Sequence, residues 1–107
     1  MTKVEKHKEW CDSLHTLYRV KNKAYGDSFG ETFKKLGIIS GVTRITDKYN
    51  RLVNLATHPD VDSGDESIKD TLIDLANYAI MTAMELDEDE EKDRIAEGIV
   101  DALAYTE

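Results

Sequence analysis

One row of polar residues gives the strongest sign of chemistry in this sequence. The row comprises Glu66, Asp70, Asp74 and Asn77. Their spacing of four, four and three residues places them along one face of a helix. Carboxylates one turn apart repel each other unless a cation lies between them. Because Mg²⁺ and Mn²⁺ prefer oxygen ligands, Glu66, Asp70 and Asp74 are candidate metal ligands, and Asp70 and Asp74 are candidate catalytic residues.

A row of cations lies earlier in the chain. It comprises Arg44, Lys48 and Arg51, with Asp47 beside them. The spacing puts the three cations on one helix face, away from the apolar stripe of the same segment. Guanidinium and ammonium groups bind phosphate oxygens, so this row and Asn77 are candidate nucleotide contacts. The competing interpretation is that the acidic and basic rows are solvated faces or a ladder of ion pairs between neighbouring helices.

The turn at residues 25–29 also admits two interpretations. In the structural one, Gly26 permits a tight turn and a capping residue starts the next helix. In the functional one, Tyr25 or Phe29 stacks on a base, while Asp27 and Ser28 contact the sugar or the base edge. Lys21, just before the turn, is a candidate phosphate contact.

Apolar periodicity predicts the helices that position these residues. Apolar residues recur every three or four positions over residues 3–23 and 38–56. Between these segments, Ser28 and Glu31 resemble a capping box that opens a short helix ending at Leu36. A fourth helix is expected from Asp65 or Ser67 to Leu86, and an acidic run at residues 87–91 predicts the start of a fifth helix over 88–104.

No strand pattern competes, so the sequence predicts a single all-α domain over residues 1–107, with four to five helices in a bundle. The fourth helix is apolar around nearly half of its circumference, and most of that surface must be buried. A bundle of this size does not easily cover it. We therefore expect a homo-oligomer that completes the bundle.

Composition and charge narrow the partners. The chain has 107 residues and a net charge of -8, with 11 Lys and Arg against 6 Asp and Glu before residue 58 and 3 against 16 from there on. An acidic protein is a poor binder of duplex nucleic acid, which requires a broad basic surface. The single cysteine and the absence of a long apolar run predict a cytoplasmic protein with no membrane partner.

Three sequence blocks carry a resemblance to a known family. They are KNKAYGDSF at 21–29, RITDK at 44–48 with Arg51 and Leu52, and ES at 66–67 followed by DTLIDLANY at 70–78. In this order they resemble a nucleotide modification associated domain of type 1, a family common in phages and prophages, over residues 21–86. The resemblance implies a nucleotide or nucleotide-derived ligand and, for a phage protein, action in the host cytoplasm.

A looser similarity is to all-α nucleoside triphosphate pyrophosphohydrolases of the MazG and dimeric dUTPase type, which place carboxylates from facing helices around Mg²⁺. Those enzymes carry Glu-x-x-Glu where this chain has Arg44, Asp47 and Lys48. Three functions therefore stay open: an Mg²⁺-dependent pyrophosphohydrolase, a non-catalytic binder that sequesters a nucleotide or a nucleotide-derived immune signal, and an oligomeric interaction module.

Overall fold

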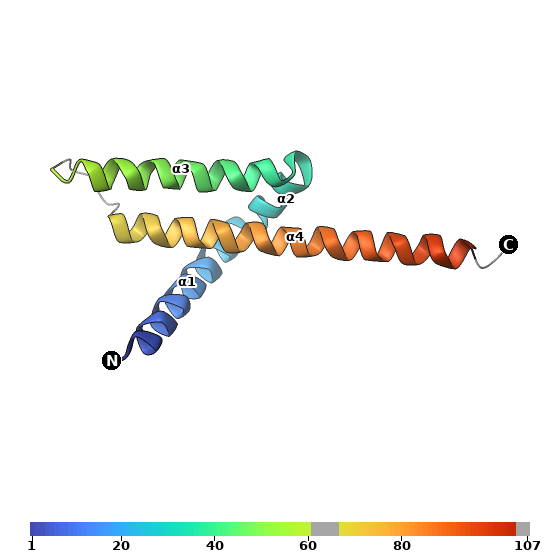
Figure 1. The fold of residues 1–107 in the computed structure, drawn as a ribbon, viewed down its shortest axis with the longest axis horizontal. Coiled ribbons are helices and arrows are strands. Elements are labelled where there is room, and N and C mark those ends of the chain that lie inside the picture. The colour runs from blue at the N-terminus through green and yellow to red at the C-terminus, as the bar shows by residue number, and fades with distance from the viewer. Residues whose placement is uncertain (61–66, 105–107) are drawn as a thin grey trace.

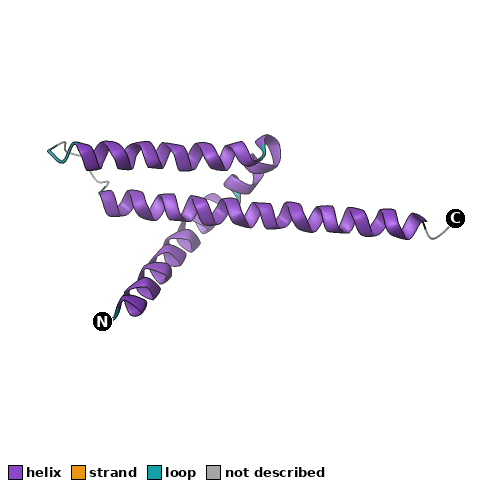
Figure 2. Cartoon of the chain, in the orientation of Figure 1, coloured by secondary structure: helices purple, strands orange, loops and turns teal. Residues whose placement is uncertain are grey.

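A computed structural model describes residues 1–60 and 67–104, which form four helices and contain no strand (Figures 1 and 2). The helices are α1 (Lys3–Tyr25), α2 (Ser28–Leu36), α3 (Ile38–Thr57) and α4 (Ile68–Ala104). The prediction of an all-α fold is confirmed, and the first three helices end within two residues of their predicted bounds. Within the described ranges, no helix is both long and apolar enough to cross a membrane.

The fourth and fifth predicted helices are one continuous helix of 37 residues. The prediction of a separate helix over 88–104 is therefore wrong. The acidic run at 87–91 lies in the interior of α4, where glutamate is well tolerated, and the run itself contains neither glycine nor proline. Further along, Arg94 forms an ion pair with Glu91 across one turn, at 3.1 Å between Nη1 and Oε2.

Helix starts follow ordinary capping chemistry, with one correction. The side chain of Asp27 accepts a hydrogen bond from the Gly30 backbone N–H at 3.3 Å, so Asp27 is the N-cap of α2. The predicted capping box that starts at Ser28 is wrong, because Ser28 is already the first helical residue. At the start of α4, the Ser67 hydroxyl accepts from the backbone N–H of Asp70, and the Asp70 carboxylate accepts from the backbone N–H of Ser67.

Helix α3 runs antiparallel to the first half of α4, and the two are closely packed (Figure 1). The two helices lie close together at Gly41, where an added methyl group would overlap the Thr82 side chain. Thr82 is held in place because its hydroxyl donates to the Tyr78 carbonyl at 2.7 Å. Small and polar residues therefore set the spacing of this pair.

The single chain has a very small core. Phe33 is the one large apolar side chain of the described residues that is buried, and α1 buries none. Leu72 and Ile80, predicted to be buried, are 46% and 51% exposed. The expected burial of the apolar half of this helix is thus not met within one chain. Helix α4 projects well past α2 (Figure 1), and the chain extends over 71 × 34 × 26 Å, so parts of α4 have no neighbour.

Candidate functional site

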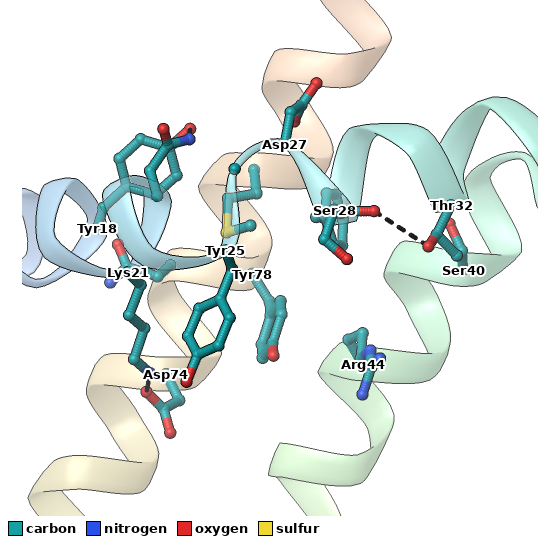
Figure 3. Close-up of a pocket in the computed structure, with 15 residues that line it drawn as sticks. Tyr18, Lys21, Tyr25, Asp27, Ser28, Thr32, Ser40, Arg44, Asp74 and Tyr78 are labelled. Atoms are coloured by element: carbon teal, nitrogen blue, oxygen red, sulfur yellow. Dashed lines mark hydrogen bonds and ion pairs between the residues drawn. The ribbon is translucent and has the colours of Figure 1, made fainter.

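A pocket of about 350 Å³ opens where the end of α1 and the start of α2 meet α3 and α4 (Figure 3). It is lined by residues from all four helices and from the turn between α1 and α2. Those from α1, the turn and α2 are Tyr18, Lys21, Asn22, Tyr25, Gly26, Asp27, Ser28, Phe29 and Thr32. Those from α3 and α4 are Ser40, Arg44, Asp74, Asn77, Tyr78 and Met81.

The turn into α2 shapes one wall of the pocket. Gly26 has a φ of 64°, a left-handed conformation that glycine adopts without strain, and it lets the chain reverse directly after α1. The cap by Asp27 then starts α2, which places the Phe29 ring 6.0 Å from the ring of Tyr78 and 6.3 Å from that of Phe33. Both ring pairs are tilted, by 40° and 39°, at distances typical of favourable aromatic contacts, so contacts between tilted rings hold this wall.

Charged side chains form another part of the pocket lining. Asp74 pairs with Lys21 through one carboxylate oxygen at 3.3 Å and with Lys48 through the other at 3.4 Å. Asp74 is 19% exposed, whereas Lys21 is 53% exposed. Arg44 reaches the pocket from α3, and Figure 3 shows it on the other side of Tyr25 from the Lys21–Asp74 pair. Two cations from different helices therefore lie at this pocket.

Helix α1 is tied to α4 by polar contacts beside the pocket. The Asn77 side-chain amide donates to the Leu14 backbone carbonyl at 3.2 Å. This carbonyl belongs to the interior of α1, so Asn77 connects the two helices at a fixed register. On α1 itself, the Asn22 amide lies 3.3 Å from the Tyr18 hydroxyl. Asn77 and the Lys21–Asp74 pair thus position the end of α1 that lines the pocket.

The structure brings together most of the residues singled out from the sequence. Eight of them line the pocket: Lys21, Tyr25, Asp27, Ser28, Phe29, Arg44, Asp74 and Asn77. Four do not line it: Asp47, Lys48, Arg51 and Asp70. Lys48 nevertheless contacts the site through Asp74, so the expected approach of the basic and acidic rows occurs at this ion pair. Glu66 lies outside the described residues.

The candidate metal ligands do not form a metal centre among the described residues. No group of three Asp, Glu, His or Cys side chains within 1–60 and 67–104 is arranged to hold a metal ion. Asp70 caps the start of α4, and the charge of Asp74 is offset by two lysines. With Glu66 outside the described residues, the Mg²⁺ or Mn²⁺ site stays a prediction.

Several lining residues were not predicted from the sequence. Tyr78 and Met81 share the polar arc of α4 with Asn77, and that position was a usable signal. Ser40 is nearly buried beside Gly41, where α3 and α4 approach each other, and only the packing reveals it. Tyr18 lies three residues before Lys21, on the same face of α1, so the spacing was again informative.

Comparison with known proteins identifies the family. Residues 21–86 match the family described as nucleotide modification associated domain 1. The match covers well over half of the chain and includes every lining residue except Tyr18. No curated protein and no solved structure matches the chain. The chain thus belongs to the nucleotide modification associated domain 1 family.

Proposed function

We propose that this protein binds a nucleotide in the four-helix pocket, with its phosphates at Lys21 and Arg44 and its base against the aromatic wall. One observation carries the proposal: cations from two helices and a pair of contacting rings line the same pocket, inside the segment that matches the family. A nucleotide is the ligand class that presents a polyanion at one end and a flat ring at the other.

Lys21 is able to bind a ligand phosphate without leaving the Asp74 carboxylate unpaired. The Lys21–Asp74 ion pair is half-exposed, and such pairs contribute about 0 to 1 kcal/mol. A phosphate with a larger negative charge therefore competes well for the lysine. Lys48, only 23% exposed, keeps Asp74 paired from the other side. Arg44 adds the planar donor group that binds phosphate through two hydrogen bonds.

The aromatic wall and the turn suit the rest of a nucleotide. Phe29 and Tyr78 supply ring faces for stacking, which is favourable for every base. Asp27 and Ser28 lie at the same wall and carry oxygens that accept hydrogen bonds from sugar hydroxyls. Tyr25, 74% exposed at the rim, covers the ligand from the solvent side in this arrangement.

Of the two possible activities, nucleotide binding without hydrolysis agrees better with the contacts of the described residues. Asp74 is already compensated by Lys21 and Lys48, so its charge does not call for a metal ion. A Mg²⁺-dependent pyrophosphohydrolase is the second candidate. Mg²⁺ is often held by one or two carboxylates together with the substrate phosphates, and Asp74 at the pocket suits that arrangement, with Asp70 one turn away. The metal would then stabilise charge on the phosphoryl oxygens.

The deciding experiment incubates the protein with a panel of ribonucleotides, deoxyribonucleotides and cyclic dinucleotides, with and without Mg²⁺ or Mn²⁺. Free and protein-bound species are separated and identified by mass spectrometry. Depletion of one intact nucleotide, recovered after denaturing the protein, supports the binder. A monophosphate appearing with pyrophosphate, and lost in Asp74→Asn, supports the hydrolase instead.

Matched variants locate the site. Arg44→Ala and Lys21→Ala are each expected to weaken binding about tenfold or more, since a hydrogen bond to a charged group contributes about 1.5 to 3 kcal/mol. Lys23→Ala is the control, because Lys23 lies on the same helix and does not line the pocket. Equal affinities for wild type, Arg44→Ala and Lys21→Ala would refute this site.

We further propose that a second copy of the chain covers the exposed apolar faces. The chain exposes 8479 Å², about 2,500 Å² more than the roughly 6,000 Å² expected of a compact protein of its mass. A standard interface buries about 800 Å² on each partner, so the excess is ample for a stable assembly. The radius of gyration, 18.9 Å, also exceeds the roughly 13 Å of a compact domain of this length.

Charge complementarity favours a second copy as the partner. Helix α1 carries six Lys and Arg against three Asp and Glu, whereas residues 87–104 of α4 carry two against eight. Both segments also expose apolar side chains, among them Val20 on α1 and Ile99 and Leu103 on α4. An antiparallel pairing of α1 from one copy with the end of α4 from another would match both patterns.

Sedimentation velocity tests this pairing. The wild-type protein is expected to sediment as a multiple of 12.1 kDa, and Ile99→Lys is expected to shift it toward the single chain, because a charge would be placed in the interface. Asn50→Lys, which adds the same charge at an exposed position of α3 outside both paired segments, is the control and should leave the mass unchanged. A wild-type monomer at all concentrations would refute the pairing.

A further inference from the structure

A second, smaller hollow of about 180 Å³ adjoins the pocket. The two share five lining residues: Tyr18, Asn22, Asp27, Phe29 and Met81. The smaller hollow adds three residues of α4, namely Met84, Glu85 and Glu88. The pocket that contains Lys21 and Arg44 and the hollow at this part of α4 are therefore neighbours, and Phe29 lines both.

Glu85 is the unusual group in this hollow. Its residue is only 8% exposed, and among the described residues its carboxylate makes neither a hydrogen bond nor an ion pair. Burying a carboxylate is costly unless a donor or a cation compensates it. No fully enclosed polar side-chain atom of the described ranges lacks a partner, so the Glu85 oxygens still reach the hollow. The methylene groups of the Glu85 side chain are thus buried, whereas its carboxylate oxygens are accessible from the hollow.

The surroundings of Glu85 define what it accepts. Asp27 at the start of α2 and Glu88 and Asp89 on α4 add negative charge, while Lys34 on α2 opposes them. Burial, with the nearby carboxylates, raises the pKa of the Glu85 carboxyl above its usual 4.5. A phosphate is therefore repelled from this hollow. A neutral group that donates hydrogen bonds is favoured, and Tyr18 and Phe29 provide ring surface for a flat one.

We propose that Glu85 recognises the base of the bound nucleotide through a ring N–H and the neighbouring exocyclic amino group, which selects guanine over hypoxanthine and over the other bases. This inference rests on the proposed nucleotide binding. The two oxygens of the Glu85 carboxylate accept hydrogen bonds from the ring N–H of guanine and from its neighbouring amino group. Hypoxanthine offers the ring N–H alone, and the corresponding edges of adenine, cytosine, uracil and thymine each pair one donor with an acceptor, which leaves one carboxylate oxygen without a donor.

The test compares guanosine triphosphate with inosine triphosphate, which differ only in the exocyclic amino group. Affinities are measured by calorimetry for this pair and for adenosine, cytidine and uridine triphosphates. Guanosine triphosphate is expected to bind most tightly, and at least about tenfold better than inosine triphosphate, the lower end of what a bidentate base contact discriminates. A preference within twofold between guanosine and inosine triphosphates, or tightest binding of another triphosphate, would overturn the inference.

Variants separate recognition from other roles of Glu85. Glu85→Gln keeps the size but offers both a donor and an acceptor, so the preference should fall below about threefold. Glu88→Gln, which lines the same hollow, is the control and should keep the preference. Should Glu85→Gln fail to fold, the wild-type comparison still decides. A Glu85→Gln protein that changes its oligomeric state and keeps the preference would assign the carboxylate to a cation of a second copy and overturn the inference.

Failure of the underlying proposal gives a different result. If no triphosphate binds, the nucleotide proposal itself is refuted. If triphosphates bind and Lys21→Ala weakens guanosine and inosine triphosphates equally, the phosphate site is supported. The comparison of these two nucleotides then tests the role of Glu85 alone.

Discussion

Replacing Gly41 by alanine tests the helix spacing on which the pocket depends. A Cβ atom on Gly41 would lie 2.9 Å from Thr82 Cγ2 and 3.2 Å from Thr82 Cβ, and closer still to the hydroxyl oxygen. Thr82 cannot rotate away without breaking its hydrogen bond to the Tyr78 carbonyl. The methyl group is therefore accommodated only by moving α3 away from α4.

Two opposing effects set the magnitude. Overpacking a tight contact costs about 1 to 3 kcal/mol. Alanine in place of glycine inside a helix is favourable by about 0.8 to 1 kcal/mol. We therefore expect Gly41→Ala to lower the free energy of unfolding by about 0 to 2 kcal/mol in the wild-type background. With Thr82→Ala, the contact is largely relieved, and the same change should be neutral or stabilising by up to about 1 kcal/mol.

A double-mutant cycle on Gly41 and Thr82 isolates the contact. Urea unfolding is followed by far-UV circular dichroism at one protein concentration, because the proposed self-association would make stability depend on concentration. The coupling energy should be about 1 to 3 kcal/mol. Ser40 and Arg44 flank Gly41 and line the pocket, so nucleotide affinity should fall in Gly41→Ala as well. A coupling energy near zero, with Gly41→Ala stabilising in both backgrounds, would refute this account of the helix spacing.

Three further predictions address the site. Asp27→Ala removes the N-cap of α2 and should destabilise the protein by about 0.5 to 2 kcal/mol in thermal unfolding. A smaller loss of stability would show that the Asp27 cap does not stabilise α2. Asn77→Ala breaks the tie to the Leu14 carbonyl, so hydrogen exchange should quicken in α1 and stay unchanged in α3; uniform exchange would contradict this. Because the pKa of the Glu85 carboxyl is raised in the folded state, the wild-type protein loses stability as pH rises from 4.5 through that raised value. Glu85→Gln removes this loss, so the variant should be more stable than wild type at neutral pH, and the difference should vanish toward pH 4.5. Parallel pH profiles of unfolding for the two proteins would refute this prediction.

Local patterns determined most of the secondary structure. The glycines at 26 and 37 end the helices that apolar periodicity predicts, because both adopt positive φ angles. The error over residues 87–104 arose because acidic residues are equally compatible with a helix start and with an exposed helix interior. The structure decides between these two alternatives, because the α4 backbone continues through the acidic run without a break.

Pocket residues that share one helix or turn could be predicted from their spacing in the sequence. Pocket residues that depend on how two helices pack against each other were harder to predict. The turn at 25–29 and the spacing on α4 identified much of the pocket in advance. Glu85 was not identified, because on a helical wheel it is one charge among many on an acidic segment. Its burial depends on how α1 and α2 cross α4, which is a tertiary feature that a single sequence does not reveal.

Ligand binding and self-association should reinforce each other in this architecture. Helix α1 has no fully buried residue: Leu14, Leu17 and Tyr18 are partly buried, and polar contacts and the contact of Lys69 with the Trp10 ring add to its attachment. Its free energy of detachment is therefore small. On the proposed arrangement, a nucleotide at Lys21 and a second copy against the outer face of α1 would each stabilise the same docked position. Whichever binds first would bear the cost of ordering α1, so the other is expected to bind more tightly.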